Sequence, residues 1–415
     1  MLFLRKVFTA TGLAFDSIRA HKLRSFLTLL GVIVGVASVI LVGAAIDGLG
    51  VYAEQITSKA FGTDSFLVAQ IASVGRLSGR QLADKQKRNK RIRMDDLKYL
   101  RSVAGDEVLY SPYQQRVEDV KAENQFYEAA NVIGVSSDMP QIRDLPVANG
   151  RFFSEVEEQR HRPVAVIGDD IRNALYPSQD PLGLSVKISG VDFTVVGVLE
   201  HLGSSFGQSL DNPVYVPTTT YQALFGGGKN MVIFGRARPE AGITLEAALD
   251  TMRGALRSRF HTRPGQDDNF DTLTPDSVRT FTSQILGVIA AVVVPVTSIS
   301  LLVGGIVIMN IMLVSVTERT REIGIRKSLG ARKADIMLQF LTESLILSLT
   351  GGALGVAAGA LAAVLVSAIS GATLAVTAPY VVISVLVSSA VGIISGWYPA
   401  KRAAQLDPVE ALRSE

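Results

Sequence analysis

The chain has 415 residues, of which 48% are hydrophobic and 19% are charged, whereas a soluble globular protein carries about 25% charged residues. It contains no cysteine, which excludes disulfides, thiolate metal sites and cysteine nucleophiles. Three segments have no charged residue at all: 25–46, 281–317 and 344–400. Because a helix crosses the hydrocarbon core of a membrane in about 20 residues, these segments predict an integral membrane protein.

The first two predicted spans differ in length. Residues 25–46 fit one membrane helix. A cleaved signal peptide is the alternative, but the basic region and the apolar run are both long for one. Residues 275–317 predict one long helix, since Thr274-Pro275 is a helix start signal. Such a helix would be roughly 60 Å long, so its first half would project from the membrane as a stalk.

The third uncharged segment is long enough for two spans. Residues 370–379 contain glycine and proline and predict a short external loop between them. We expect the spans on either side at residues 341–369 and 380–398. Residues 1–24 are amphipathic near the N-terminus and predict a helix that lies along the inner membrane surface.

Basic residues beside the spans predict the orientation. Segments 1–24, 318–340 and 399–415 contain five, six and three Lys or Arg residues, and the loop 370–379 contains none. The positive-inside rule therefore places both termini and the loop 318–340 in the cytoplasm. Residues 47–280 have 27 basic and 30 acidic residues, so the basic excess borders the membrane. This distribution argues for contact with membrane lipid and against nucleic-acid binding.

The external residues 47–274 predict an α+β domain of two subdomains, with the middle one inserted into the outer one. Ser189-Gly190 predicts a hairpin turn between two strands. Helices are expected at residues 94–102, 169–175 and 245–260. Short β-branched runs predict strands at residues 65–68, 164–167, 185–188, 193–198, 214–216 and 231–234. The predicted fold class is a membrane protein of four transmembrane helices with this large domain inserted between the first and second spans.

A basic segment lies within the external domain. Residues 85–93 contain six basic residues in nine. The pattern is typical of a solvated, mobile loop. Contact with anionic lipid head groups or with an acidic partner is the alternative interpretation.

No pattern in the sequence predicts catalysis. The four histidines lack the spacing of metal ligands, and there is no G-x-S-x-G or H-E-x-x-H motif. Residues 226–230 lack the first glycine and the Ser or Thr of a phosphate-binding loop. We therefore expect no catalytic, cofactor-binding or metal site in this chain, and a membrane-anchored enzyme is disfavoured.

The span cores contain no ionisable residue, which disfavours an ion-coupled transporter. Glu343 lies near the cytoplasmic start of the third span. Stabilisation of its charge by a helix N-terminus is one explanation, and contact with a cytoplasmic partner is the other.

Small residues recur at four-residue spacing in two spans. Such stripes let helix backbones approach closely. They permit either packing within one chain or a dimer interface. The residues are Gly31 and Gly35 in the first span, and Gly351, Gly355 and Gly359 in the third.

Three long motifs follow one another along the chain: HKLRSFLTLLGVIVGVA at 21–37, TERTREIGIRKSLGA at 317–331 and YPAKRAAQLDPVEALR at 398–413. Together they resemble the MacB/FtsX family of ABC-transporter permeases. Four shorter segments of the external domain resemble the MacB-type periplasmic core domain, namely 150–153, 164–168, 180–183 and 193–198.

The resemblance implies the permease subunit of an ATP-driven efflux transporter in a bacterial inner membrane, with the large domain in the periplasm. MacB itself resembles a fusion with an N-terminal ATPase, and this chain begins about 24 residues before its first span. We therefore expect a separate ABC ATPase, which would bind ATP and Mg²⁺. A homodimer, a periplasmic adaptor and an outer-membrane duct are further implied partners. An FtsX-like signalling subunit that controls a periplasmic cell-wall hydrolase, and a lipoprotein-release permease, are the alternatives.

The resemblance also implies that the loop 318–340 docks on the ATPase. Movement of the ATPase would then be transmitted mechanically along the stalk helix. Ile323 and Ile325 would be apolar anchors among charged side chains. A helix held on the lipid surface by its basic residues is the alternative. The candidate coupling residues are Glu318, Arg319, Arg321, Glu322, Ile323, Gly324, Ile325, Arg326 and Lys327.

Overall fold

The structure is a computed structural model that describes residues 22–62, 64–123, 125–205, 208–227, 231–370 and 374–413. The helix predicted at the N-terminus therefore lies almost entirely outside the described residues. The chain divides into two units. Residues 1–52 and 283–415 form a helical unit, and residues 53–282 form an external unit.

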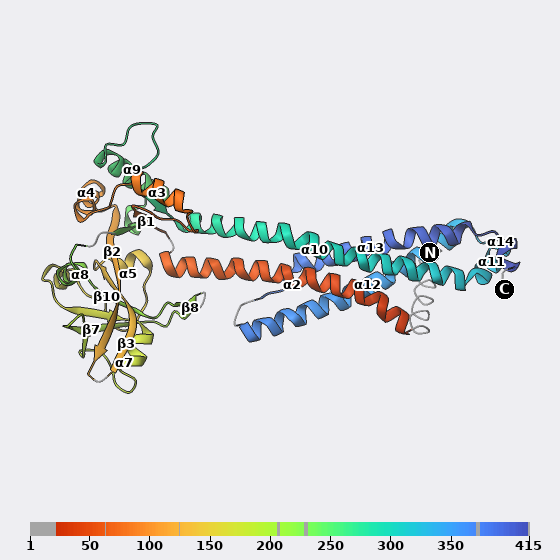
Figure 1. Ribbon diagram of the computed structural model, residues 1–415, viewed down its shortest axis with the longest axis horizontal. Helices are drawn as coiled ribbons and strands as arrows, with labels where there is room; N and C mark the ends of the chain where they lie inside the picture. The colour runs from red at the N-terminus through yellow and green to blue at the C-terminus, as the bar shows by residue number, and fades with distance from the viewer. Residues whose placement is uncertain are drawn as a thin grey trace. The chain divides into compact units, whose positions relative to one another are not determined.

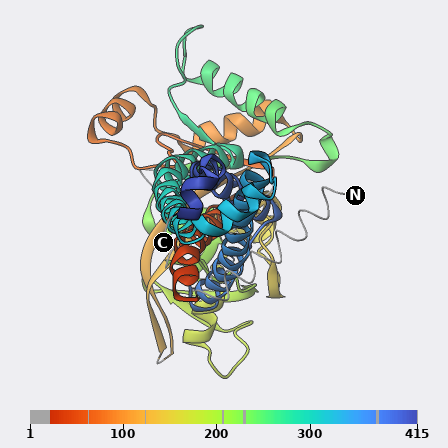
Figure 2. The same ribbon diagram turned by 90° about the vertical axis from the view of Figure 1, so that its right-hand side faces the viewer.

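Four helices in the described part of the chain are long and apolar enough to cross a membrane. They are α2 (Lys22–Phe61), α10 (Pro275–Glu318), α12 (Lys333–Ser370) and α13 (Ala378–Gln405) (Figure 1). In the helical unit they lie side by side, as the end-on view in Figure 2 shows. Their buried apolar side chains form one core, which includes Val36, Ile308 and Phe340. Two short helices, α11 (Thr320–Ser328) and α14 (Pro408–Arg413), complete this unit among the described residues.

Both glycine stripes are filled by other helices of the same chain. A Cβ atom added to Gly31 would lie 2.8 Å from the Cα atom of Gly304 in α10. A Cβ atom added to Gly355 would lie 2.7 Å from the Cβ atom of Val36 in α2. These contacts support packing within one chain over a dimer interface. The other stripe residues meet the same helices: Gly35 faces α10, and Gly351 and Gly359 face α2.

Helices α12 and α13 pack through two serines that face two glycines. The sequence analysis did not predict this contact. A Cβ atom on Gly396 would lie 1.9 Å from Oγ of Ser344, and one on Gly392 would lie 2.0 Å from Oγ of Ser348. Both serines are fully buried, and the hydroxyl of Ser344 donates to the carbonyl of Leu341 in its own helix. The four-residue spacing of each pair was the signal available in the sequence.

The external unit is built on one sheet of ten strands in the described residues, with the order β12-β1-β11-β2-β3-β10-β5-β7-β4, and β6 pairs with β2 and β7. The strands β8 (Ser204–Ser205) and β9 (Gln208–Ser209) form a separate hairpin. The strands of the large sheet are β1 (Ser65–Ala69), β2 (Val108–Ala122), β3 (Gln125–Val135), β4 (Val147–Gly150), β5 (Val164–Ile167), β6 (Ser185–Ile188), β7 (Val191–Leu199), β10 (Pro213–Pro217), β11 (Val232–Ala237) and β12 (Asp271–Leu273).

Helices pack on this sheet at both ends. All six predicted strands and all three predicted helices exist, with small differences at their ends. The hairpin turn between β6 and β7 lies at Ser189-Gly190, with φ angles of 45° and 87°. The helices are α3 (Gly79–Arg88), α4 (Met94–Ala104), α5 (Met139–Arg143), α6 (Glu155–Gln159), α7 (Asp169–Leu175), α8 (Thr218–Phe225), α9 (Leu245–Arg259) and a 3₁₀ turn at Pro239–Ala241.

The long strand β2 runs through two hydrophobic cores of the external unit. Its first residues, including Val108 and Tyr110, pack with α4 and α9 in an outer core. Its last residues, Val120 and Ala122, pack with β5, β7 and α7 in a core formed by the middle of the sequence. These two cores and a third, which includes Met139, Phe153 and Phe234, are built on one continuous sheet.

The prediction of a mobile loop at residues 85–93 is wrong for residues 85–88, which form the last turn of α3. Ser78 and Gln81 form a capping box at the start of this helix. Nζ of Lys85 lies 2.6 Å from Oδ2 of the buried Asp271, and Arg88 pairs with Asp267 at 3.2 Å. These acidic partners lie more than 170 residues away in the sequence, so local composition could not predict them.

Candidate coupling surface

The short helix α11 is the segment that the sequence analysis assigned to coupling. Figure 1 shows it beside α14 at the end of the helical unit where α10 ends and α12 begins. Ile323 and Gly324 are buried, and Ile323 is only 2% exposed because it packs in the core of the four long helices. The prediction that Ile323 anchors a partner is therefore wrong, because this side chain already lies inside its own chain.

The opposite side of α11 is exposed. Arg321 and Glu322 point to the surface, Ile325 is 44% exposed, and Leu329, which follows the helix, is 82% exposed. Exposed large apolar side chains outside a membrane span suit a protein contact. We call these four residues the coupling surface.

Lys327 joins α11 to the end of α13. Its Nζ atom donates hydrogen bonds to the carbonyl oxygens of Ala404 at 2.7 Å and Leu406 at 2.6 Å. These carbonyls belong to the last turn of α13, where a cation is favourable. Burial, and secondarily the charge of Lys333, lower the pKa of Lys327 below its ordinary value. The structure therefore uses this predicted docking residue for contacts within the chain.

Arg326 joins α11 to α12. Its Nη1 atom donates to Oε1 of Gln339 at 2.7 Å, and its Nη2 atom forms an ion pair with Glu322, one turn earlier in α11. A guanidinium group can hold both partners at once because its donors form a rigid fork. Arg326 therefore fixes how α11 lies against α12.

Arg319 and Glu343 form a further link between the end of α10 and α12, with 3.5 Å between Nη1 and Oε2. Glu343 is only 5% exposed. It lies ten residues inside α12, which begins at Lys333, so the prediction that a helix N-terminus stabilises its charge is wrong. The cation of Arg319 compensates this buried carboxylate instead.

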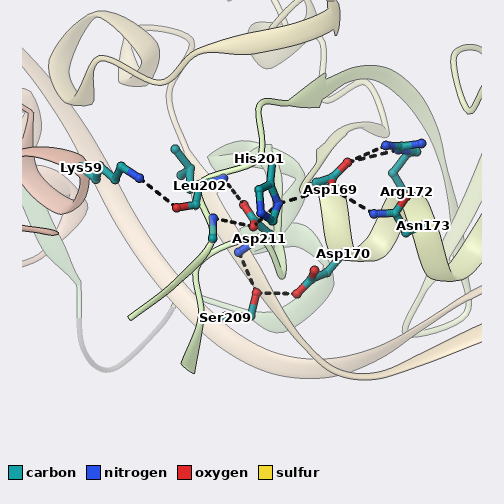
Figure 3. A network of polar contacts seen from close by, with 10 residues as sticks. Lys59, Asp169, Asp170, Arg172, Asn173, His201, Leu202, Ser209 and Asp211 are labelled. Atoms are coloured by element: carbon teal, nitrogen blue, oxygen red, sulfur yellow. Dashed lines mark hydrogen bonds and ion pairs between the residues drawn. The ribbon is translucent and has the colours of Figure 1, made fainter. Parts of the chain in front are cut away.

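A second polar cluster lies in the external unit, around the loop that follows β7 (Figure 3). Asp211 is 2% exposed and accepts hydrogen bonds from the backbone N–H groups of Leu202 at 2.6 Å and Gly203 at 2.8 Å. Nδ1 of His201 lies 2.7 Å from Asp211 and 3.4 Å from Asp169. His201 is thus isolated in the sequence but contacts two carboxylates in the fold.

This cluster has a structural role in the external unit. Nζ of Lys59, in the last turn of α2, donates to the carbonyl of Leu202 at 2.9 Å. Asp169 is also bonded to Arg172 and Asn173 (Figure 3), and the Arg172 guanidinium lowers its pKa. Among the described residues, no group of three or more His, Asp or Glu side chains is arranged to hold a metal ion. The hydrogen bonds and ion pairs of Asp169 and Asp211 therefore hold the loop that follows β7 against α7.

Two family models match the chain in succession. The MacB-like periplasmic core domain matches residues 25–255, and the FtsX-like permease C-terminal domain matches residues 283–408. The chain belongs to the MacB/FtsX family of ABC-transporter permeases. It is a non-catalytic transmembrane component, and the predicted fold class of four spans and a large external α+β domain is confirmed.

Individual relatives differ in how much of their length the chain covers. It is 36% identical over 409 residues to the macrolide export ATP-binding/permease protein MacB of Bdellovibrio bacteriovorus, covering 97% of this chain and 61% of that protein. It is 33% identical over 408 residues to the uncharacterized ABC transporter permease YknZ of Bacillus subtilis, covering 97% of this chain and 98% of YknZ.

A solved structure of the periplasmic region of MacB from Actinobacillus actinomycetemcomitans is also similar. The TM-score is 0.43 at 16% identity, over 55% of this chain and 95% of that one. This similarity is too low to add to the family assignment.

Proposed function

We propose that this chain is the permease of a MacB-type efflux transporter that is driven by a separate ATPase. The coupling surface is the observation that carries the proposal. It presents two charged and two apolar side chains, while Arg319, Arg326 and Lys327 bind α11 and its flanks to α12 and α13. A force applied to α11 would therefore reach the long helices together instead of bending a loose loop.

The long helix α10 suits mechanical transmission. It is one continuous helix of 44 residues, about 66 Å long at 1.5 Å per residue. It starts from β12 of the external unit and ends beside α11. The uncharged segments of its sequence offer no polar path for a substrate. ATP-driven movement of α11 would change the external domain, which would then expel a hydrophobic compound, peptide or glycolipid delivered to it.

The proposed setting is a bacterial inner membrane, with both termini and α11 in the cytoplasm and residues 47–274 in the periplasm. The basic residues that flank the spans support this orientation. Two copies of the permease would work with two ATPase subunits, a periplasmic adaptor and an outer-membrane duct. The full-length match to YknZ, which is named as a permease alone, supports a separate ATPase.

Co-purification tests the coupling surface. The variants Ile325→Asp and Leu329→Asp should reach the membrane but lose ATPase affinity on the order of 30-fold, as expected for interface anchors worth about 2 kcal/mol. Val103→Asp is the matched control, since Val103 is 48% exposed on α4 of the external unit. ATPase recovery with either coupling variant equal to that of the control would refute docking at this surface.

The same purification separates transport from signalling. An ABC ATPase recovered together with a periplasmic adaptor supports efflux. An ATPase recovered with a cell-wall hydrolase would instead support the FtsX-like signalling role.

A further inference from the structure

Two adjoining cavities lie in the external unit beside the basic segment. The first has a volume of about 520 Å³ and is lined by Gln70 and Gln86, among others. The second has a volume of about 310 Å³ and is lined by Gln114 and Gln222. Both are lined by Arg91, Ile92 and Met231. We call the two together the Arg91 cavity.

The floor of the Arg91 cavity is apolar. Ile92 and Met231 are 3% and 4% exposed and belong to the outer hydrophobic core. Met94, which lines the second cavity, packs against the same core. Ile71 and Val232, which line the first cavity, are partly exposed, so a bound molecule could bury an apolar part against them.

A buried amide at the second cavity has an unused donor. Gln114 is 3% exposed and lies on β2 between the stretches that pack in the two cores. Its Oε1 atom accepts a hydrogen bond from Nε2 of Gln222 at 3.1 Å. Among the described residues, nothing accepts a hydrogen bond from its own NH₂ group. An acceptor atom of a bound ligand could therefore accept a hydrogen bond from this NH₂ group.

Four of the six cationic side chains of the basic segment fall into two groups. Lys85 and Arg88 pair with Asp271 and Asp267. Arg91 and Arg93, which line the cavity, form no ion pair with any described residue. No acidic residue is among the described residues that line either cavity. The cavity therefore offers uncompensated positive charge, which favours an anion.

We propose that the Arg91 cavity binds an anionic amphiphile. Its carboxylate or phosphate group would meet Arg91, Arg93 and the amide of Gln114, and its apolar part would cover the partly exposed Ile71, Met94 and Val232. A membrane lipid and a soluble compound can both supply this chemistry. The site goes beyond the proposed export role, since binding here requires neither ATPase docking nor transport.

The absence of cysteine from the chain permits a direct test on the full-length protein. In the variant Gln86→Cys, the new thiol lies on the exposed face of α3 and borders the cavity. The protein is placed in phosphatidylcholine nanodiscs, and its reaction rate with N-ethylmaleimide is followed by mass spectrometry. Dodecyl phosphate should slow the modification several-fold. Adding Arg91→Gln should raise the concentration for half-protection about tenfold, which corresponds to one charge-assisted hydrogen bond.

Lys87→Gln is the matched control for charge, because Lys87 is exposed on α3 and does not line the cavity. Equal effects of Lys87→Gln and Arg91→Gln would overturn the proposal, since they would show a non-specific basic surface. Equal protection by dodecanol or by dodecyltrimethylammonium would remove the anionic requirement, and equal protection by inorganic phosphate would remove the apolar one. Protection in phosphatidylglycerol nanodiscs without additive would support the proposal and identify the lipid as the source. Protection only after addition of dodecyl phosphate would support a soluble ligand.

Discussion

The packing of Gly355 against α2 allows a quantitative prediction for the substitution Gly355→Ala. The new Cβ atom would lie 2.7 Å from Cβ of Val36 and 3.0 Å from the carbonyl oxygen of Ile33. Neither atom can rotate away, because the position of each is set by the backbone of α2. The two helices must therefore separate by several tenths of an ångström, and the packing of Val36, which is 1% exposed, must loosen.

Two opposing effects determine the size of the change. Overpacking of a well-packed core costs about 1–3 kcal/mol, whereas alanine is better than glycine inside a helix by about 0.5–1 kcal/mol. We expect a net loss of about 1–2 kcal/mol in the free energy of unfolding. Gly351→Ala should cost less, because its Cβ atom would lie 3.1 Å from that of Val32. Gly287→Ala in α10 should not cost stability, since nothing lies within 4 Å.

Unfolding by SDS in mixed micelles, followed by the fluorescence of Trp397, measures these differences, because Trp397 is the single tryptophan of the chain. If Gly355→Ala is as stable as Gly287→Ala, the packing argument is refuted. A loss of stability that depends on protein concentration would instead indicate that the stripe lies between two copies of the chain.

Two further predictions concern polar contacts outside the spans. Lys327→Met should accelerate hydrogen exchange in residues 404–413 about tenfold, because the carbonyls at the end of α13 lose a charged donor. Lys401→Met, at an exposed position of α13, is the control and should not accelerate exchange. Equal exchange in both variants would contradict the role of Lys327 as a donor to the carbonyls at the end of α13. In the external unit, hydrogen bonds from Arg151 hold the pKa of Glu157 at about 2, below its ordinary 4.5. Because the pKa of Glu157 is lower in the folded state, its ionised carboxylate stabilises the fold at pH values above 4.5. This stabilisation is lost as the pH falls from 4.5 toward 2. Arg151→Gln should therefore weaken the acid dependence of the unfolding temperature in that range, and an unchanged dependence would count against the pairing.

Much of the helical unit was accessible from the sequence because its signals are local. Long uncharged segments predict spans wherever they occur, and α10 begins at Pro275, the residue that the start signal indicated. Strands β5 and β6 also match their predicted ends. A short run of β-branched residues next to turn residues is a local pattern that needs no knowledge of partners.

The long hairpin of β2 and β3 was missed for a physical reason. Residues 115, 116, 119 and 121 of β2 carry exposed polar or charged side chains, so the apolar alternation that marks a strand is weak there. The backbone is held by its pairing with β3 and β11. The pairing with β11, and that of Val120 and Lys121 with β6, depends on residues far away in the sequence, and propensity alone does not predict it.

The coupling surface shows what the sequence by itself determined and what only the tertiary structure decided. The sequence identified a short charged helix between two spans, because charge and length are properties of the segment. It could not separate Ile323, which is buried, from Ile325, which is exposed. Nor could it assign Lys327 to the end of α13, 77 residues further on. Burial and hydrogen-bond partners depend on which helices pack against one another, and only the folded chain specifies that packing.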